Sequence, residues 1–189
     1  DGNTSGAVNA ATVTTLTGTA ATANTAYASS GISGLGNEAV TLSDTSLAAT
    51  VLNTLDDNTT GAVNAATVTT LTGLGGDINV SYASSGITGL GDEAVTLSDI
   101  TIDGAVLNTL DGNTTGAVNA SALTTISGAA ADANTAYASN GITGLGNEIA
   151  SISDVSITAS VLNTLDGNTT GEVNGTNLTT ITGATADVN

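Results

Sequence analysis

Hydrophobic and polar positions alternate over short stretches of this chain, and the alternation predicts β-strands. "TVTTLTG" at 12–18 and "AVTLSD" at 39–44 combine β-branched residues with a period of two, and they end in Gly or Asp. In the second stretch we expect Val40 and Leu42 to face a core and the polar residues that follow each of them to face solvent. The pattern therefore predicts strands of only a few residues, separated by turns.

A different hydrophobic spacing predicts a short helix at 45–56. In "TSLAATVLNTLD" the three leucines and the valine recur at helical spacing, and Thr45 or Ser46 is a possible N-cap. The segment 19–29, "TAATANTAYAS", is compatible with a helix, an irregular loop or a strand. Its counterpart "LGGDINVSY" at 74–82 carries two adjacent glycines, which destabilise a helix by about 2 kcal/mol relative to alanine.

The whole pattern repeats at evenly spaced positions, as the equivalent Asp1, Asp56, Asp111 and Asp166 show. A fixed period of about 55 residues without insertions is typical of an array of stacked or successive units. The alternatives are a solenoid and separate beads on a string. We expect three full units and one partial unit, at residues 1–55, 56–110, 111–165 and 166–189.

Each unit also contains a weaker internal echo, since "ANTAYASSGI" at 23–32 resembles "LNTLDDNTTGAV" at 52–63 with one gap. The echo divides a unit into two coils of about 25 and 30 residues, near 6–30 and 31–60. Neither coil is large enough to enclose a core alone, which favours stacking. The predicted fold class is a β/α repeat solenoid, with parallel stacked short strands and a short helix or loop in each coil. An all-β solenoid is the alternative, because Thr, Val and Asn are abundant and form helices poorly.

Composition and charge restrict the chemistry of such a solenoid. The chain has 17 Asp and Glu residues and no Lys, Arg or His, so its formal net charge is −17 and no side-chain ion pair can form. Each carboxylate must be solvated, hydrogen-bonded to N–H groups or neutralised by a bound metal. Nucleic acid is excluded as a partner because phosphate binding needs cations. No run of about 18 apolar residues is present, so we expect no membrane insertion.

The phrase "LNTLDGNTTGAVNA" at 107–120 places oxygen-bearing residues like the front of a calcium loop. The twelfth position of such a loop needs a bidentate carboxylate, and here it is Ala122. An EF-hand is therefore rejected, and a turn that closes a helix is the simpler interpretation. The oxygen-bearing residues of the phrase stay candidate Ca²⁺ ligands; these are Asp56, Asp111, Asn113 and Asp166.

A second acidic motif, "GLGNEAVTLSD" at 34–44, recurs in every full unit. If equivalent strands stack, its carboxylates form columns about 5 Å apart, which repel unless Ca²⁺ or another divalent cation lies between them. The alternative is that Asp44 caps the following helix and Glu38 lies in a solvated turn. The candidate ligands of this motif are Glu38, Asp44, Glu93, Asp99, Glu148 and Asp154.

Three further patterns suggest other roles. The Asn-Thr-Ser or Asn-Thr-Thr triplets at Asn3, Asn58, Asn113 and Asn168 are potential glycan acceptors. Threonine-rich strands could display an array that orders water on an ice-binding face, although threonine ladders are also ordinary sheet chemistry. The residues predicted to form a stacked amide ladder are Asn9, Asn64, Asn119 and Asn174.

We expect no enzyme, because without His, Lys, Arg or Cys only carboxylate pairs remain as acid and base, and these pairs recur in every full unit.

The phrases "GITGLGNE", "LNTLDGNTTGAVNA" and "TVTTLTG" resemble the tandem repeats of giant cell-surface or secreted proteins of marine cyanobacteria, including motility-associated ones. That resemblance implies an extracellular or cell-surface location in a calcium-rich setting. The expected function is a structural module of a surface layer, stalk or fibre, stiffened by divalent cations and associated with other copies or further repeats. An adhesin or ice-binding surface is the alternative.

Overall fold

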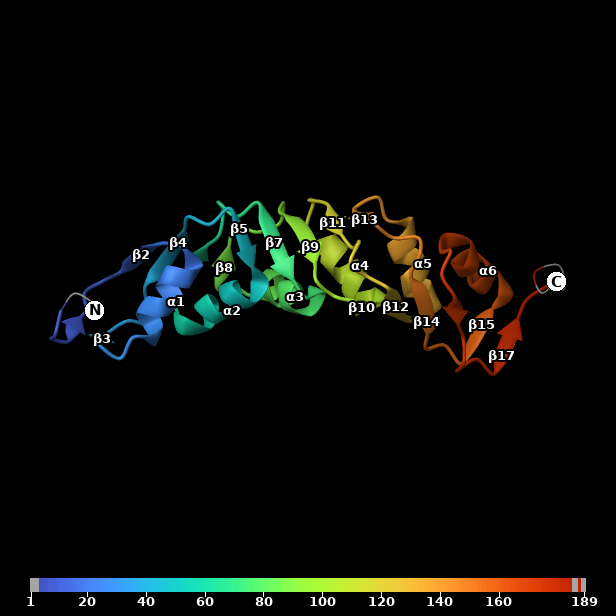
Figure 1. Ribbon diagram of the computed structural model, residues 1–189, viewed down its shortest axis with the longest axis horizontal. Coiled ribbons are helices and arrows are strands. Elements are labelled where there is room, and N and C mark those ends of the chain that lie inside the picture. The colour runs from blue at the N-terminus through green and yellow to red at the C-terminus, as the bar shows by residue number, and fades with distance from the viewer. Residues whose placement is uncertain (1–3, 185–186, 188–189) are drawn as a thin grey trace.

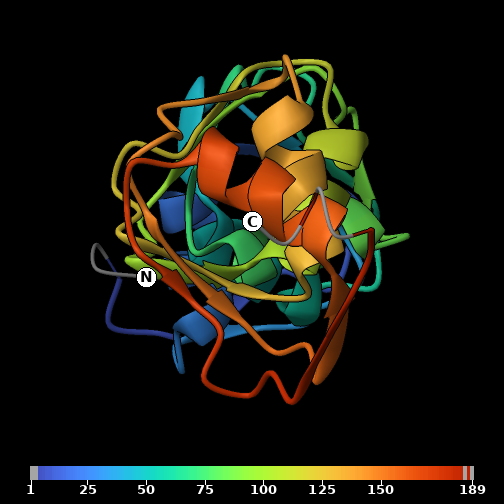
Figure 2. The ribbon, with the colours of Figure 1, turned by 90° about the vertical axis from the view of Figure 1, so that its right-hand side faces the viewer.

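A computed structural model describes residues 4–184 and residue 187, and the chain forms an elongated solenoid (Figure 1). The first and last coils lie at opposite ends of the rod, and the successive coils overlap when the rod is viewed along its length (Figure 2). Short parallel strands alternate with short helices, as predicted for a β/α solenoid. The all-β alternative is wrong.

The helices alternate between nine and ten residues and follow one another along the rod (Figure 1). Each helix packs against the next one in the sequence. None of the helices in the described residues is long and apolar enough to cross a bilayer. The helices are α1 (Ala20–Ala28), α2 (Ala49–Asn58), α3 (Gly75–Ala83), α4 (Gly104–Asn113), α5 (Ala130–Ala138) and α6 (Ala159–Asn168).

All strand pairs are parallel, and the strands form five separate sheets within the described residues. The outer sheets are β1 (Val8–Asn9) with β3 (Ile32–Ser33), and β15 (Ser156–Thr158) with β17 (Thr180–Thr182). The next sheet contains β2 (Thr15–Gly18), β4 (Ala39–Leu42), β6 (Val63–Asn64) and β8 (Ile87–Thr88). The central sheet contains β5 (Ser46–Ala48), β7 (Thr70–Gly73), β9 (Ala94–Leu97), β11 (Val118–Asn119) and β13 (Ile142–Thr143). The remaining sheet contains β10 (Thr101–Asp103), β12 (Thr125–Gly128), β14 (Ile149–Ile152) and β16 (Val173–Asn174).

Strand register fixes the length of one coil. Leu16 pairs with Val40, which pairs with Val63, which pairs with Ile87. One coil is therefore about 24 residues long, and the repeat unit exceeds two such coils by about seven residues. Strand β5 accounts for the excess, because three strands separate α1 from α2 but only two separate α2 from α3. The predicted division of each unit into two unequal coils agrees with this alternation, since each full unit holds two helices. The strand register does not divide evenly into the unit, so equivalent residues of successive units lie in different sheets.

The helix predicted at 45–56 forms, but it begins later. Leu47 lies in β5, where it pairs with Leu71 of β7, and α2 begins at Ala49. Its N-cap is Ala48, whose side chain cannot cap, so the proposed capping by Thr45 or Ser46 is wrong. Pairing with the neighbouring coil holds 46–48 extended, which local spacing could not reveal.

The ambiguous segment at 19–29 is helical in all three full units, as α1, α3 and α5 show. The glycines do not prevent this in α3, whose first residue, Gly75, is buried against the next coil. A methyl group on Gly75 would lie 2.7 Å from the Ile102 Cδ1 atom of the next coil. Close packing between coils therefore favours a residue without a side chain here, even though glycine has a low helix propensity.

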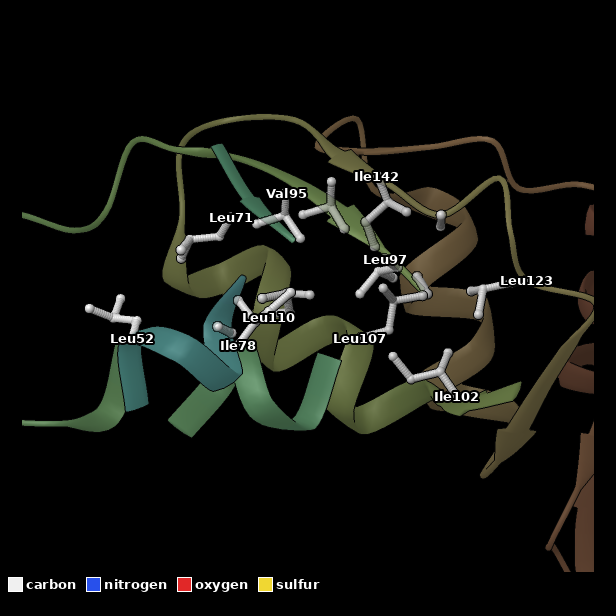
Figure 3. Packing of buried hydrophobic residues seen from close by; sticks show 14 of the residues in the cluster. Leu52, Leu71, Ile78, Val95, Leu97, Ile102, Leu107, Leu110, Leu123 and Ile142 are labelled. Carbon is white, nitrogen blue, oxygen red and sulfur yellow. The ribbon is translucent and has the colours of Figure 1, made fainter. Parts of the chain in front are cut away.

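One continuous hydrophobic core runs through the described coils. Leu71 and Val95 point inward from strands β7 and β9, and Leu107 and Leu110 meet them from α4 (Figure 3). Inward Val40 and Leu42 alternate with exposed residues in β4, as predicted. Burial of one leucine contributes about 1.5–3 kcal/mol, so many thin contacts stabilise the rod coil by coil.

Candidate functional site

A buried glutamate precedes a strand in each full unit, and it is the least expected feature of the molecule. Glu38, Glu93 and Glu148 precede β4, β9 and β14, and each is 0% exposed. The prediction that Glu38 lies in a solvated turn is therefore wrong. Strand pairing on both sides of β4 draws the preceding loop into the wall of the solenoid.

One carboxylate oxygen of each glutamate accepts several hydrogen bonds. The Oε2 atom of Glu38 accepts from the Tyr27 hydroxyl at 3.1 Å, the Gly36 N–H at 2.8 Å and the Asn37 N–H at 3.2 Å. The tyrosine comes from the helix that precedes the loop, 11 residues earlier. The arrangement recurs at Glu93 with Tyr82 and Gly91, and at Glu148 with Tyr137, Gly146 and Asn147.

A threonine from the next coil completes the site. Thr59 follows α2, and its hydroxyl donates to the backbone carbonyl oxygen of Glu38 at 2.7 Å. The same hydroxyl accepts from the Gly61 N–H at 3.0 Å, and Gly61 lies so close to the Glu38 peptide that a methyl group would collide with it. Equivalent contacts join Thr114 and Gly116 to Glu93, and Thr169 and Gly171 to Glu148. We call each set a Tyr–Glu–Thr cluster: Tyr27, Glu38 and Thr59; Tyr82, Glu93 and Thr114; Tyr137, Glu148 and Thr169.

These contacts shift the protonation equilibria. Burial acts to raise the pKa of Glu38, but hydrogen bonds from backbone N–H groups and from Tyr27 outweigh it, and the pKa lies below its ordinary value. Burial, together with the charge of Glu148, raises the pKa of Tyr137 to about 12. Burial also raises the pKa of Tyr27 and of Tyr82. At neutral pH each tyrosine is therefore a hydrogen-bond donor to its glutamate.

The second carboxylate oxygen has no such support. The Oε1 atoms of Glu38, Glu93 and Glu148 are buried and have no hydrogen-bond partner among the described residues. They are the only buried side-chain oxygen or nitrogen atoms of the described part of the chain in this condition. An unpaired buried acceptor is rare in native proteins, and it indicates a position that a ligand or a solvent molecule can occupy.

The second acidic residue of the motif binds a helix terminus. The Oδ2 atom of Asp44 accepts from the Ala20 N–H, the first of α1, at 2.8 Å. Asp44 therefore caps the helix of the preceding coil, and the prediction that it caps the following helix is wrong. A carboxylate at this position also interacts favourably with the helix dipole. Asp99 and Asp154 bind Gly75 and Ala130 in the same way.

The predicted carboxylate columns do not form. Strands β4, β9 and β14 belong to three different sheets, so Glu38, Glu93 and Glu148 do not stack on one another. The excess length of each unit over two coils is the reason. Among the described residues, no three His, Cys, Asp or Glu side chains are grouped to hold one metal ion.

The phrase at 107–120 forms contacts between coils. The Asn113 amide nitrogen donates to the Asn79 Oδ1 atom at 3.0 Å, and Asp111 accepts from the Ser139 hydroxyl at 2.7 Å. The phrase thus holds the end of α4 to the coils on both sides. In the other units, Asn58 binds Asn24, Asn168 binds Asn134, and Asp56 binds Ser84, whereas Asp166 is exposed.

The candidate glycan acceptors therefore use their amide nitrogens inside the fold, except for Asn3, which lies outside the described residues. The predicted amide ladder is also wrong. Asn64 lies between Thr41 and Thr88 in its sheet, and its Oδ1 atom accepts from the Ala66 N–H in a local turn.

An asparagine ladder instead connects the helices, and sequence analysis missed it. The Asn53 amide nitrogen in α2 donates to the Asp77 carbonyl oxygen of α3 at 2.9 Å, and each described helix contributes one such asparagine. The shared Asn-Thr of the echoed phrases "ANTAYASSGI" and "LNTLDDNTTGAV" was the available signal. The ladder residues are Asn24, Asn53, Asn79, Asn108, Asn134 and Asn163.

Comparison with known proteins gives no relative: no family model, no curated protein and no solved structure matches this chain.

Proposed function

We propose that this chain is an elongated structural module of an extracellular or cell-surface protein, part of a surface layer, stalk or fibre. The observation that carries the proposal is that parallel strand pairing is repeated along the whole rod. Every strand from β1 to β17 pairs with a strand of a neighbouring coil, in five separate sheets that follow one another along the described chain. Because the same interface joins each coil to the next, every added repeat unit lengthens the rod without changing its width, as a spacer or fibre requires.

The connections between coils support a rigid rod. Hydrogen bonds join each helix to the next through the asparagine ladder, and each Tyr–Glu–Thr cluster connects residues 27, 38 and 59 or their equivalents. These polar contacts fix the rotation of one coil relative to the next, which apolar packing of small side chains specifies poorly. Other copies or further repeats of the same protein are the partners in this proposal.

The one-sided charge supports a location rich in cations. A net charge of −17 with no basic side chain repels itself, and salt and divalent cations reduce that repulsion. The absence of Lys and Arg also leaves trypsin no cleavage site, which suits exposure outside a cell. Divalent cations are therefore part of the proposed assembly.

Two measurements test the proposal. Electron microscopy or small-angle scattering of chains with three and six units should give rods of equal width, the second about twice as long as the first. Antibody labelling of intact cells of the source organism should detect the protein at the surface. Compact particles, or protein found only inside cells, would contradict the structural role.

A second candidate function rests on exposed threonine rows. Thr17, Thr41, Asn64 and Thr88 lie side by side on the outer face of one sheet, at the spacing of neighbouring strands. Such a row could bind an ordered surface such as ice or a crystalline polysaccharide. Thermal hysteresis measured on the wild type and on Thr41→Tyr tests it, and equal freezing behaviour of the chain and a control protein would reject the ice-binding candidate.

A further inference from the structure

The unpaired Oε1 atoms of the three buried glutamates require a physical explanation. Each belongs to a side chain that is 0% exposed, and no described donor reaches it. The same feature occurs at Glu38, Glu93 and Glu148, in three copies of nearly the same motif. A defect in the packing of one coil would not repeat in this way, so the unpaired oxygen is a property of the repeat.

A buried carboxylate with one unpaired oxygen is energetically unfavourable unless something neutralises it. In most proteins a lysine, arginine or histidine serves this purpose, but this chain contains none. The Oε2 atom is already occupied by the tyrosine hydroxyl and the backbone N–H groups. These donors stabilise the charge on Oε2, but the chain has no cationic side chain to balance it, so a counter-charge can come only from solution, and Oε1 is the atom left to bind it.

We propose that Glu38, Glu93 and Glu148 each bind one hard cation through Oε1, so that every full repeat encloses one ion beside its Tyr–Glu–Thr cluster. The chain offers oxygen ligands only, since it has no Cys, His or Met, and oxygen ligands select cations of the Ca²⁺ type. With one carboxylate per ion, carbonyl groups, hydroxyl groups and water complete the coordination. Sites of this kind bind weakly, with a dissociation constant on the order of 10⁻⁴–10⁻³ M, as in extracellular calcium modules.

This inference deepens the proposed function by assigning its divalent cations to particular atoms. It also selects among the ten ligands expected from the sequence. Asp44, Asp99 and Asp154 use an oxygen to cap a helix, and Asp56 and Asp111 bind serine hydroxyls. Only the glutamates combine complete burial with an unpaired oxygen in the described part of the chain.

Terbium luminescence provides a site-specific test, because Tb³⁺ replaces Ca²⁺ and emits when a nearby aromatic ring is excited. The chain has three Tyr and no Trp, and each tyrosine hydroxyl lies 3.0–3.2 Å from the Oε2 atom of its glutamate. We expect Tyr-sensitised emission that saturates at three ions per chain and that excess Ca²⁺ displaces. Tb³⁺ bound to exposed aspartates elsewhere would add little sensitised emission.

Matched variants connect the emission to the glutamates. Glu93→Gln keeps the size of the side chain, removes the charge and should reduce sensitised emission and Ca²⁺ stoichiometry by about a third. Tyr82→Phe leaves Glu93 in place and should reduce the emission while the ion still binds. Asp57→Asn changes an exposed carboxylate and should change neither. Circular dichroism of each variant verifies that the coils remain folded.

Absence of saturable sensitised emission, or emission that Glu93→Gln leaves unchanged, would overturn the proposal. If Glu93→Gln unfolds the chain, calorimetry of the wild type decides: a melting temperature that Ca²⁺ and chelator leave unchanged also overturns it. Either result would indicate that Oε1 holds a proton or a water molecule. Electron microscopy could still show the rods of the proposed function, so failure of the cation site can be distinguished from failure of the structural role.

Discussion

The hydroxyl of Thr59 donates to the backbone carbonyl oxygen of Glu38 at 2.7 Å, and thereby joins the end of α2 to the loop before β4 in the preceding coil. Thr59 is almost fully buried and Glu38 is completely buried. The bond is also repeated in the two following units, from Thr114 and Thr169. The repeated phrase at 107–120 and its equivalents, which resembles the front of a calcium loop, thus forms a contact between coils.

Close packing beside this bond predicts a strong effect of a small substitution. Gly116→Ala places a methyl group against the Glu93 carbonyl group, where the neighbouring atoms are backbone and cannot move aside. We expect a loss of about 2–4 kcal/mol in the free energy of unfolding, measured by urea denaturation. Gly112→Ala is the control: its methyl group meets no heavy atom within 4 Å in α4, so it should be neutral or stabilise by up to about 1 kcal/mol. Equal effects of the two substitutions would contradict the close contact.

The lowered pKa of Glu38 predicts a dependence of stability on pH. Its folded pKa lies below the ordinary value of 4.5, so its contribution is complete above that value and is lost as the pH falls through the folded pKa. Acid also reduces the repulsion of the −17 charge, so wild type and Glu38→Gln must be compared. We expect the difference in unfolding free energy between the two proteins to shrink as the pH falls from 6 to about 3. A constant difference, measured by denaturation at each pH, would rule out this titration.

The helix cap of Asp99 can be tested in the same way. Asp99→Ala removes the acceptor of the Gly75 N–H and the negative charge at the N-terminus of α3. We expect a loss of about 1 kcal/mol in thermal or urea unfolding. Asp57→Ala removes an exposed carboxylate near the C-terminus of α2, where a negative charge is unfavourable, and should cause no loss. Destabilisation of both variants to the same degree would indicate a general charge effect.

The asparagine ladder predicts a cost for removing one amide. Asn108→Ala in α4 removes the amide that donates to the Asp132 carbonyl oxygen of α5 at 2.9 Å. The expected loss is about 1 kcal/mol, although alanine forms helices better than asparagine does. Thr109→Ala is a matched control in the same helix, since the exposed threonine hydroxyl bonds only to the Ala105 carbonyl oxygen within α4. If chemical denaturation shows that the Asn108→Ala variant is as stable as the Thr109→Ala variant, or more stable, the ladder does not stabilise the fold.

Much of the local structure could be predicted from the sequence. The alternation around Val40 and Leu42 indicated the strand and its inward face, and the leucines near Leu52 indicated a helix. The fixed repeat period indicated stacking, and the lack of cationic side chains excluded ion pairs. These features depend on near neighbours in the chain and on composition, so no structure was needed to infer them.

The neighbours of each residue across coils were decided by the tertiary structure alone. Strand pairing between adjacent coils, and not the period of the sequence repeat, determines what lies beside Glu38 and Asp44. The sequence alone suggests that equivalent residues of successive units lie beside one another, and this assumption led to the prediction of carboxylate columns. The pairing of β2 with β4 places Asp44 at the start of α1, and the pairing of β4 with β6 brings Thr59 against the buried Glu38. Register is a collective property of many weak contacts, and no single stretch of the chain encodes it.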